Sequence, residues 1–417
     1  MEHHEAVVIG AGHAGLAASQ RLAAAGIDHL VLERGRIGET WRSQRWDTFA
    51  LNTPSWANRL PGDTDDDVLP PADAFHSATV FAGRLAGYAA RWGLPVHERT
   101  AVDSVSPRPD GFEVGIAGTG AERLRARSVV VASGIQNVPR LPPIAAELPG
   151  WVTQLHSLAY RDPVALPEGA VLVVGGGQTG GQIVEDLLEA GRRVYLAPSN
   201  VPRMPRRYRG RDIFEWLTET GFWDVRPEQL PDPAMVRIRQ PLISGVGRLG
   251  HTVSLQWLAA RGATLVGRIR AVEADALLLD DTVGACIRFG DTWSATIARM
   301  IDAAVEAAGA ALPEREDDPA DEPHPDPDSV HSPERMDLRA LGITTVIWAT
   351  GVRGDFSWLP AHLVDADGGL VQQAGRTPLP GLFALGFPWL TRRGSGVIAG
   401  ITPDAQLVAD AVAARAT

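Results

Sequence analysis

The chain has 417 residues, 45% of them hydrophobic, which is enough for roughly two to three domains with ordinary cores and excludes a disordered or fibrous protein. Its formal net charge of −11 and the absence of a dense basic stripe with interleaved aromatic residues argue against a nucleic acid partner. The single cysteine, Cys286, excludes an intramolecular disulfide, a CxxC redox pair and a cysteine-built zinc site, and we predict no metal site.

Residues 6–35 predict a strand, a glycine turn, a helix and a second strand, because apolar runs flank a segment with apolar side chains at helical spacing. The turn, GAGHAG, places Gly10, Gly12 and Gly15 at the spacing of the dinucleotide-binding fingerprint. Glu33 ends the second strand, at about the distance (~20 residues) at which an acid binds a ribose hydroxyl. We therefore predict a dinucleotide site here.

The same pattern recurs at residues 171–198, where VLVVGGGQTGG leads from a strand into a helix. The turn contains Gly175, Gly177, Gln178, Thr179 and Gly180. This duplication predicts a second dinucleotide site in the same chain.

The second site lacks the acid of the first. No Asp or Glu occurs from residue 190 to 211, and arginines are frequent there. A carboxylate would repel a 2′-phosphate, whereas a guanidinium gives it a planar, bidentate partner. We therefore predict NADPH rather than NADH, with Arg203 and Arg206 as phosphate ligands. The alternative is that these arginines are solvated or pair with acidic side chains.

The fold class predicted from this duplication is α/β, with two Rossmann-like dinucleotide-binding domains in a glutathione-reductase-like architecture. Prolines after residue 134 mark a crossing between domains, and the strand-like segment ITTVIWATG marks the return. We expect the first part of one domain at residues 1–145, the second domain at 146–335 and the rest of the first at 336–417. The acidic, proline-rich residues 312–334 favour an exposed loop.

Several further segments give the chain its resemblance to a known family. Both fingerprints, VVVASGIQNVPRLP, VIWATG and GLFALGFPWLTRRGSG are similar to segments of the class B flavoprotein monooxygenases, which include the flavin-containing monooxygenases. This resemblance implies FAD in the first site and NADPH in the second. It also implies that Ser133 and Gly134, like Thr350 and Gly351, end strands that link the domains.

The resemblance implies further site residues, and some family positions differ. Asn52, in the segment LNTP, matches an asparagine beside the reactive face of the flavin, although a turn residue before Pro54 is the alternative. His156 is in register with the family signature between the domains, but Gly150 and Val152 replace its Phe and Gly, and a structural role is the alternative. The other positions implied as cofactor contacts are Arg34, Trp41, Arg42, Val102 and Gly386.

The C-terminal segment is expected to pass the flavin ring. Backbone amides near Gly400 and Ile401, at the start of a predicted helix, would face the negative charge of the reduced flavin. Arg393 is the second residue that we expect to act in catalysis, with a surface role as the alternative.

The function implied is that of an NADPH-dependent FAD monooxygenase, which forms a C4a-(hydro)peroxyflavin and oxygenates a small organic substrate at nitrogen, sulfur or an electron-rich aromatic carbon. The alternative is an NADPH-dependent flavin reductase or oxidase, and a nucleotide-sensing subunit is a third, non-enzymatic one. The expected partners are a small-molecule substrate and O2. Because no apolar run approaches ~20 residues and a strand follows the first residues directly, we expect a cytoplasmic protein without membrane contact.

Overall fold

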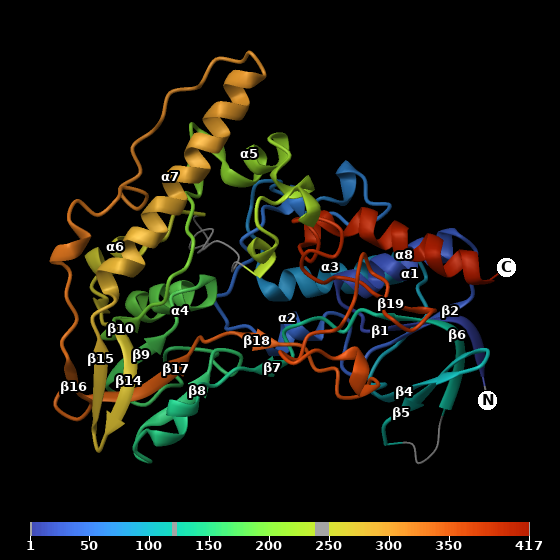
Figure 1. The fold of residues 1–417 in the computed structure, drawn as a ribbon, viewed down its shortest axis with the longest axis horizontal. Coiled ribbons are helices and arrows are strands. Elements are labelled where there is room, and N and C mark those ends of the chain that lie inside the picture. Colours follow the sequence, from blue (N-terminus) through green and yellow to red (C-terminus); the bar gives the residue numbers. More distant parts are fainter. Residues whose placement is uncertain (1, 119–122, 238–249, 417) are drawn as a thin grey trace.

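The computed structural model describes residues 2–118, 123–237 and 250–416. Residues 238–249, which fall inside the predicted second domain, lie outside the described residues. Figure 1 shows two sheets side by side, each with helices packed against it, and both chain ends next to the first sheet. The predicted α/β fold class with two dinucleotide-binding domains is confirmed.

The first sheet has seven strands. In pairing order they are β3 (Val96–His97), β2 (His29–Leu32), β1 (His3–Ile9), β6 (Arg123–Val131), β5 (Gly111–Ile116) and β4 (Val102–Arg108), with β19 (Leu382–Ala384) also pairing with β6. Strands β3, β2, β1, β6 and β19 are parallel, while β4, β5 and β6 pair antiparallel. Its helices are α1 (His13–Ala24), α2 (Glu39–Ser43), α3 (Ala78–Arg91) and α8 (Ile401–Ala416). Strand β1, near the middle of this sheet, is fully buried at Ala6, Val7 and Val8, which explains its continuous apolar run.

The second sheet is parallel throughout. Its order is β13 (Thr264–Leu265), β10 (Val194–Ala197), β9 (Ala170–Val174), β17 (Ile343–Trp348) and β8 (Thr153–His156). A separate antiparallel sheet contains β14 (Arg268–Glu273), β15 (Ala276–Asp280) and β16 (Arg335–Asp337). The helices of this half are α4 (Gln178–Glu189), α5 (Ile213–Glu219), α6 (Leu255–Ala260) and α7 (Val283–Ala307).

The chain returns to the first domain later than the sequence predicts. Strand β17 pairs with β8 and β9, so residues 343–348 complete the second sheet instead of starting the last part of the first domain. The two crossing segments then pair with each other, as β7 (Val138–Pro139) and β18 (Val352–Arg353). The boundary was misplaced because an apolar strand can join either sheet, and its sequence alone does not say which.

A small additional core lies between α5 and α7 and joins the second domain to the first. It contains Ala57 from the first domain together with Met204, Phe214, Leu217 and Ile297. Two short strands, β11 (Arg207–Tyr208) and β12 (Arg211–Asp212), border it. Figure 1 shows α7 extending from the second sheet, with the segment after it running back alongside.

The acidic segment 312–334 is mostly exposed, as predicted, but several hydrogen bonds tie it to the second domain, and two of its residues are buried. Ala320 and Asp321 are buried, and the Asp321 carboxylate accepts hydrogen bonds from Arg203 and Ser294.

Short 3-10 turns complete the secondary structure of the described residues. They are Ser55–Ala57, Asp65–Asp67, Pro143–Glu147, Phe222–Asp224, Pro227–Gln229, Pro233–Arg237, Pro327–Ser329, Ala361–Leu363 and Ile398–Gly400.

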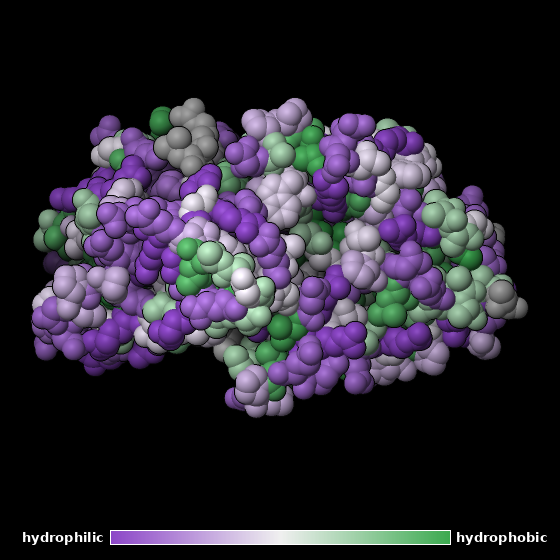
Figure 2. All heavy atoms as spheres, turned by 90° about the horizontal axis from the view of Figure 1, so that it is seen from above, coloured by the Kyte–Doolittle hydropathy of each residue, from purple (hydrophilic) through white to green (hydrophobic). Residues whose placement is uncertain are grey.

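The surface seen from above is mostly hydrophilic, with small, separated hydrophobic patches (Figure 2). Among the described residues, no helix combines the length and apolar character needed to cross a bilayer. Within the same residues, no group of three or more His, Cys, Asp and Glu side chains could hold a metal ion.

Candidate active site

The first glycine turn joins β1 to α1, and each of its three glycines has a separate reason. Gly10 has φ of +107°, and a Cβ there would lie 2.6 Å from the carbonyl oxygen of Ala132. A Cβ on Gly15 would lie 1.8 Å from the carbonyl oxygen of Gly10, so helix and turn could not pack. Gly12 has an ordinary φ and open space around its Cβ position. What remains as the reason for glycine at position 12 is the close approach of a ligand.

The second turn, between β9 and α4, has the same geometry. Gly175 has φ of +114°, with a Cβ position 2.3 Å from the carbonyl oxygen of Ala349. A Cβ on Gly180 would lie 1.9 Å from the carbonyl oxygen of Gly175, and the space beside Gly177 is open. Both turns present a helix N-terminus to a groove, which suits a diphosphate.

The groove at the first turn has a volume of about 450 Å³. Two buried polar atoms in its lining, His13 Nε2 and Ser133 Oγ, have no hydrogen-bond partner among the described residues. Burial lowers the pKa of His13 to about 4, so the ring is neutral at pH 7. Unsatisfied buried polar atoms next to an open helix N-terminus fit a polar ligand such as the FAD predicted here.

Glu33 lies at the end of β2 and lines this groove. Its two carboxylate oxygens accept hydrogen bonds from the amides of Ala11, at 2.7 Å, and Gly35, at 2.8 Å. The carboxylate therefore holds the glycine turn against the end of β2, and each oxygen retains acceptor capacity for a ribose hydroxyl.

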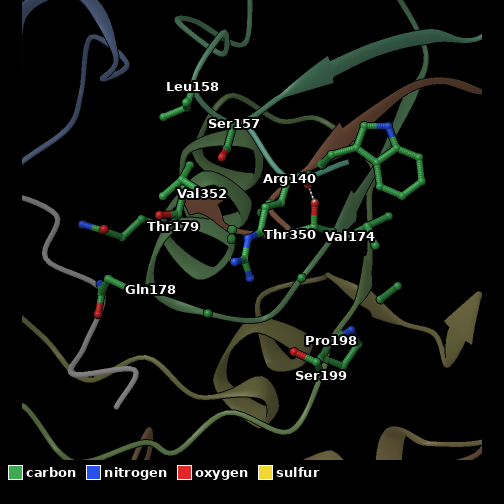
Figure 3. A pocket seen from close by; sticks show the side chains of 18 of the residues that line it. Arg140, Ser157, Leu158, Val174, Gln178, Thr179, Pro198, Ser199, Thr350 and Val352 are labelled. Atoms are coloured by element: carbon green, nitrogen blue, oxygen red, sulfur yellow. Dashed lines mark hydrogen bonds between the residues drawn. The ribbon is translucent and has the colours of Figure 1, made fainter. Parts of the chain in front are cut away.

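A larger groove, of about 1070 Å³, lies along the second turn. Its walls include Gly177 and Thr179 at the start of α4, Pro198 after β10, and Arg140 from the crossing segment. Figure 3 shows the Arg140 side chain pointing into this groove, and a hydrogen bond from the Thr350 hydroxyl to its carbonyl group. This groove can take an extended dinucleotide along the carboxyl ends of β9 and β10.

The two grooves share one wall. Trp41, Gln44, Arg45 and Gln136 line both. Ligands in the two grooves would therefore approach each other at this wall. This is the arrangement that hydride transfer between two dinucleotide cofactors requires. Asn52 also lines the larger groove.

Most of the predicted contacts lie in these linings. The smaller groove contains Gly10, Gly12, Glu33, Arg34, Trp41, Val102, Ser133, Gly134 and Gly386. The larger groove contains Trp41, Asn52, Gly175, Gly177, Gln178, Thr179, Gly180, Thr350 and Gly351. Gly15 packs beneath the first turn instead of facing the groove. The contacts of these residues with cofactors remain predictions.

The two arginines predicted to bind a 2′-phosphate lie elsewhere. Arg203 is 3% exposed and pairs with Asp291 and Asp321. Arg206 is 1% exposed, pairs with Asp212 at 2.6 Å, and packs on the ring of Phe75. The alternative, pairing with acidic side chains, holds for both. The sequence could not indicate these pairs. Asp291 and Asp321 are far along the chain from Arg203, and Asp212 reaches Arg206 only through the turn between β11 and β12.

His156 and Arg42 also have structural contacts. The Nε2 atom of His156 lies 3.0 Å from the carbonyl oxygen of Gly351, and its Nδ1 accepts the Leu158 amide. Both ring nitrogens are thus used within the chain, and the ring connects β8 to the crossing segment. Arg42 donates to the carbonyl groups of Ile37 and Ala82. Neither residue lines either groove, so the structural role that was the alternative for His156 has support, and their contacts with a cofactor stay predictions.

Arg393, Gly400 and Ile401 also lie outside both linings, although Gly386 and Gly396 of the same C-terminal segment line the first groove. The Arg393 guanidinium packs over the rings of Phe222, at 4.0 Å, and Trp389, outside both linings. The Gly400 amide donates to Val397, and Ile401 is fully buried. These contacts were not foreseen because they depend on how the last helix packs.

The sequence predicted no site role for His13, Arg140 or Arg268, which line the grooves. His13 lies inside the first fingerprint, and Arg140 lies inside the segment VVVASGIQNVPRLP, so the motifs themselves could have indicated both residues. Arg268 begins β14, far along the chain from the second turn, and no local pattern indicates it. The Val266 amide donates to Leu196 at 2.9 Å, which brings Arg268 close to the end of β10.

Comparisons with known proteins agree with this geometry. Residues 7–212 match the family model described as pyridine nucleotide-disulphide oxidoreductase. An uncharacterised CzcO-like oxidoreductase of Geobacillus kaustophilus is 29% identical over 96% of each chain. Indole-3-pyruvate monooxygenase YUCCA1 of rice is 31% identical over 59% of this chain and 60% of its own. A flavin-containing monooxygenase from Stenotrophomonas maltophilia has the same fold over the full length of both chains, with a TM-score of 0.66 at 19% identity.

The comparisons support the resemblance of this chain to the class B flavoprotein monooxygenases. The comparisons support an oxidoreductase with sites for FAD and a nicotinamide nucleotide. We expect FAD at the first glycine turn and the nicotinamide nucleotide at the second. The protein's preference between NADPH and NADH, its substrate and its reaction belong to the proposal that follows.

Proposed function

We propose that this protein is an NADPH-dependent FAD monooxygenase that oxygenates a small organic substrate at nitrogen, sulfur or an electron-rich aromatic carbon. The observation that carries the proposal is the wall shared by the two dinucleotide grooves, formed by Trp41, Gln44, Arg45 and Gln136. Bound FAD would accept a hydride from NADPH and activate O2. The chain would bind both cofactors, orient them at this wall and exclude water from it.

The test is anaerobic reduction of the holoprotein by NADPH, followed by rapid mixing with O2. A monooxygenase should show a transient absorbance distinct from those of oxidised and reduced flavin, and little hydrogen peroxide while it lasts. Immediate recovery of the oxidised spectrum with one hydrogen peroxide per NADPH would favour the alternative, a flavin reductase or oxidase. No bleaching by NADPH would contradict both enzymes and favour the nucleotide sensor.

A disulfide reductase on this scaffold is disfavoured by the cysteine content. Cys286 is the only cysteine in the sequence, so no redox pair exists. It is buried in the lining of the larger groove, and burial raises the pKa of its thiol to about 11. The thiolate that would attack a disulfide is therefore scarce at neutral pH.

Arg268 is our candidate for the 2′-phosphate ligand in place of Arg203 and Arg206. Its side chain is 74% exposed, lines the larger groove, and pairs with Asp280 at 2.8 Å. We expect Arg268→Ala to raise the KM for NADPH by roughly 10- to 100-fold, because a charge-assisted hydrogen bond is lost, and to leave the KM for NADH unchanged.

Arg270→Ala is the matched control for this prediction. Arg270 lies on the same strand and also pairs with Asp280, but it lies outside the groove lining. Steady-state NADPH and NADH consumption measures the effect. Equal losses with both nucleotides in Arg268→Ala would show that the arginine supports the strand and does not select the phosphate.

Asn52 lines the larger groove, and we keep it as the proposed catalytic hydrogen-bonding residue. Asn52→Ala should increase hydrogen peroxide release per NADPH roughly tenfold, because one hydrogen bond to a charged group is worth about 1.5–3 kcal/mol. The anaerobic rate of flavin reduction, measured in parallel, should stay near that of the unmodified protein. Unchanged peroxide release would leave Asn52 as a turn residue only.

A further inference from the structure

The larger groove has a charge pattern opposite to that of the protein. The chain carries a formal net charge of −11, yet the described lining of this groove contains three arginines and no Asp or Glu. These arginines are Arg45, Arg140 and Arg268. Such a lining attracts anions. The phosphate groups of a nicotinamide dinucleotide would be some of the anions bound there.

Two of the three arginines lie along the dinucleotide part of the groove. Arg268 is close to the end of β10, where a 2′-phosphate is expected. Arg140 points into the groove beside the second glycine turn (Figure 3), where the amides at the start of α4 face the diphosphate. Arg268 and Arg140 can therefore bind the phosphates of NADPH, and Arg45 is left without an assigned anion.

Arg45 lies at the other end, on the wall shared with the FAD groove. Its guanidinium donates to the Gln44 carbonyl at 2.9 Å and to Gln136 Oε1 at 2.5 Å, and both acceptors are neutral. No carboxylate among the described residues lies within ion-pair distance of it. Arg203 and Arg206, which are buried, are by contrast neutralised by aspartates. Arg45 is therefore a partly buried cation without a carboxylate at ion-pair distance among the described residues.

The Arg45 side chain stays positively charged at pH 7, and no nearby negative charge balances it. Burial, together with the positive charge of nearby Arg161, lowers the pKa of Arg45 to about 10. The side chain is still a cation at pH 7, and an anion brought next to it would gain more than it would at an exposed arginine.

Aromatic side chains adjoin this cation. The Arg45 guanidinium packs over the rings of Trp41, at 5.1 Å, and Phe49, at 5.3 Å. Trp46 contacts Phe49 edge to face at 5.0 Å, and all three rings line the larger groove. A ligand held here would place an anionic group on Arg45 and an apolar body against these rings.

We propose that Arg45 binds the carboxylate of the substrate, and that the substrate is a small carboxylate with an aromatic or aliphatic body packed against Trp46 and Phe49. This inference rests on the proposed oxygenase function and names the substrate class of that same site. The same oxyanion chemistry is available from a phosphate of the dinucleotide, so the experiment separates the two sources.

The experiment measures binding to the oxidised holoprotein by the change in flavin absorbance. The probes are phenylacetate, 3-phenylpropionate and indole-3-acetate, each compared with its uncharged amide. We expect at least one carboxylate to bind at least roughly tenfold more tightly than its amide, the size of one charge-assisted contact. Arg45→Met should abolish this difference, and Arg45→Lys should retain part of it.

Dissociation constants for NADPH are measured on the same variants. Arg45→Met should leave NADPH binding nearly unchanged, whereas Arg140→Met, on the same groove, should weaken NADPH binding and keep the preference for carboxylates. Weaker NADPH binding in Arg45→Met with an unchanged carboxylate preference would assign Arg45 to a cofactor phosphate and overturn the proposal. Equal binding of carboxylate and amide in all three pairs would also overturn it. Because the readout is binding, failure of the oxygen test above would be distinguishable from either result.

Discussion

Gly180→Ala should abolish reduction of the flavin by NADPH while the protein still binds FAD. The added Cβ would lie 1.9 Å from the carbonyl oxygen of Gly175, so the start of α4 must move away from the second turn. Because this helix N-terminus is the expected diphosphate site, we expect the reduction rate at a fixed NADPH concentration to fall roughly 100-fold or more. Stopped-flow absorbance of the flavin measures it.

Two controls separate this effect from a general loss of structure. Dithionite should still reduce the flavin of Gly180→Ala, since the first turn is untouched. Gly83→Ala, in the middle of α3 with open space around its Cβ position, should reduce with NADPH at the normal rate. An active Gly180→Ala protein would mean that the second turn does not hold the nicotinamide nucleotide.

Asp212→Asn should destabilise the fold more than any other single change of charge proposed for this protein. Asp212 is 7% exposed and accepts two hydrogen bonds from the Arg206 guanidinium, at 2.6 and 2.9 Å. The amide keeps the shape but leaves a buried guanidinium without its counter-charge. We expect a loss of about 3–5 kcal/mol in the free energy of unfolding, measured by urea denaturation of the holoprotein.

An exposed ion pair provides the matched control for this change. Glu273 pairs with Arg335 at 2.8 Å, with both side chains more than half exposed, so Glu273→Gln should cost less than about 1 kcal/mol. The double variant Asp212→Asn with Arg206→Met should lose less stability than Asp212→Asn alone, because no unpaired charge remains. A single variant as stable as the unmodified protein would show that the buried pair is not closed in solution.

Arg206 also connects the second domain to the candidate site. Its Nη1 donates to the Asn52 carbonyl at 2.7 Å, and Asn52 lines the groove where the two cofactors are expected to approach. The residue that the sequence assigned to a phosphate therefore supports the turn of a proposed catalytic residue. The sequence could not indicate this, because the two residues are 154 positions apart.

The two glycine turns show how far sequence reasoning extends. Gly10 and Gly15, like Gly175 and Gly180, are fixed by clashes with backbone atoms a few residues away or at the neighbouring strand end, and such requirements repeat wherever this turn is built. The turns, the fold class and the order of the domains could therefore be predicted. The domain boundary after β17 could not, since its pairing with β8 and β9 is a choice between two sheets.

The arginines show what the sequence leaves open. The sequence shows how many arginines there are and that several follow the second turn. It does not show that Arg203 pairs with Asp291, 88 positions away, or that the hydrogen-bond acceptors of Arg45 are neutral and its guanidinium packs on aromatic rings. Local backbone geometry, which acts between near neighbours, determined the two dinucleotide turns from the sequence alone. The tertiary structure decided which cations face the groove, because ion pairing and burial depend on contacts between residues distant in the chain.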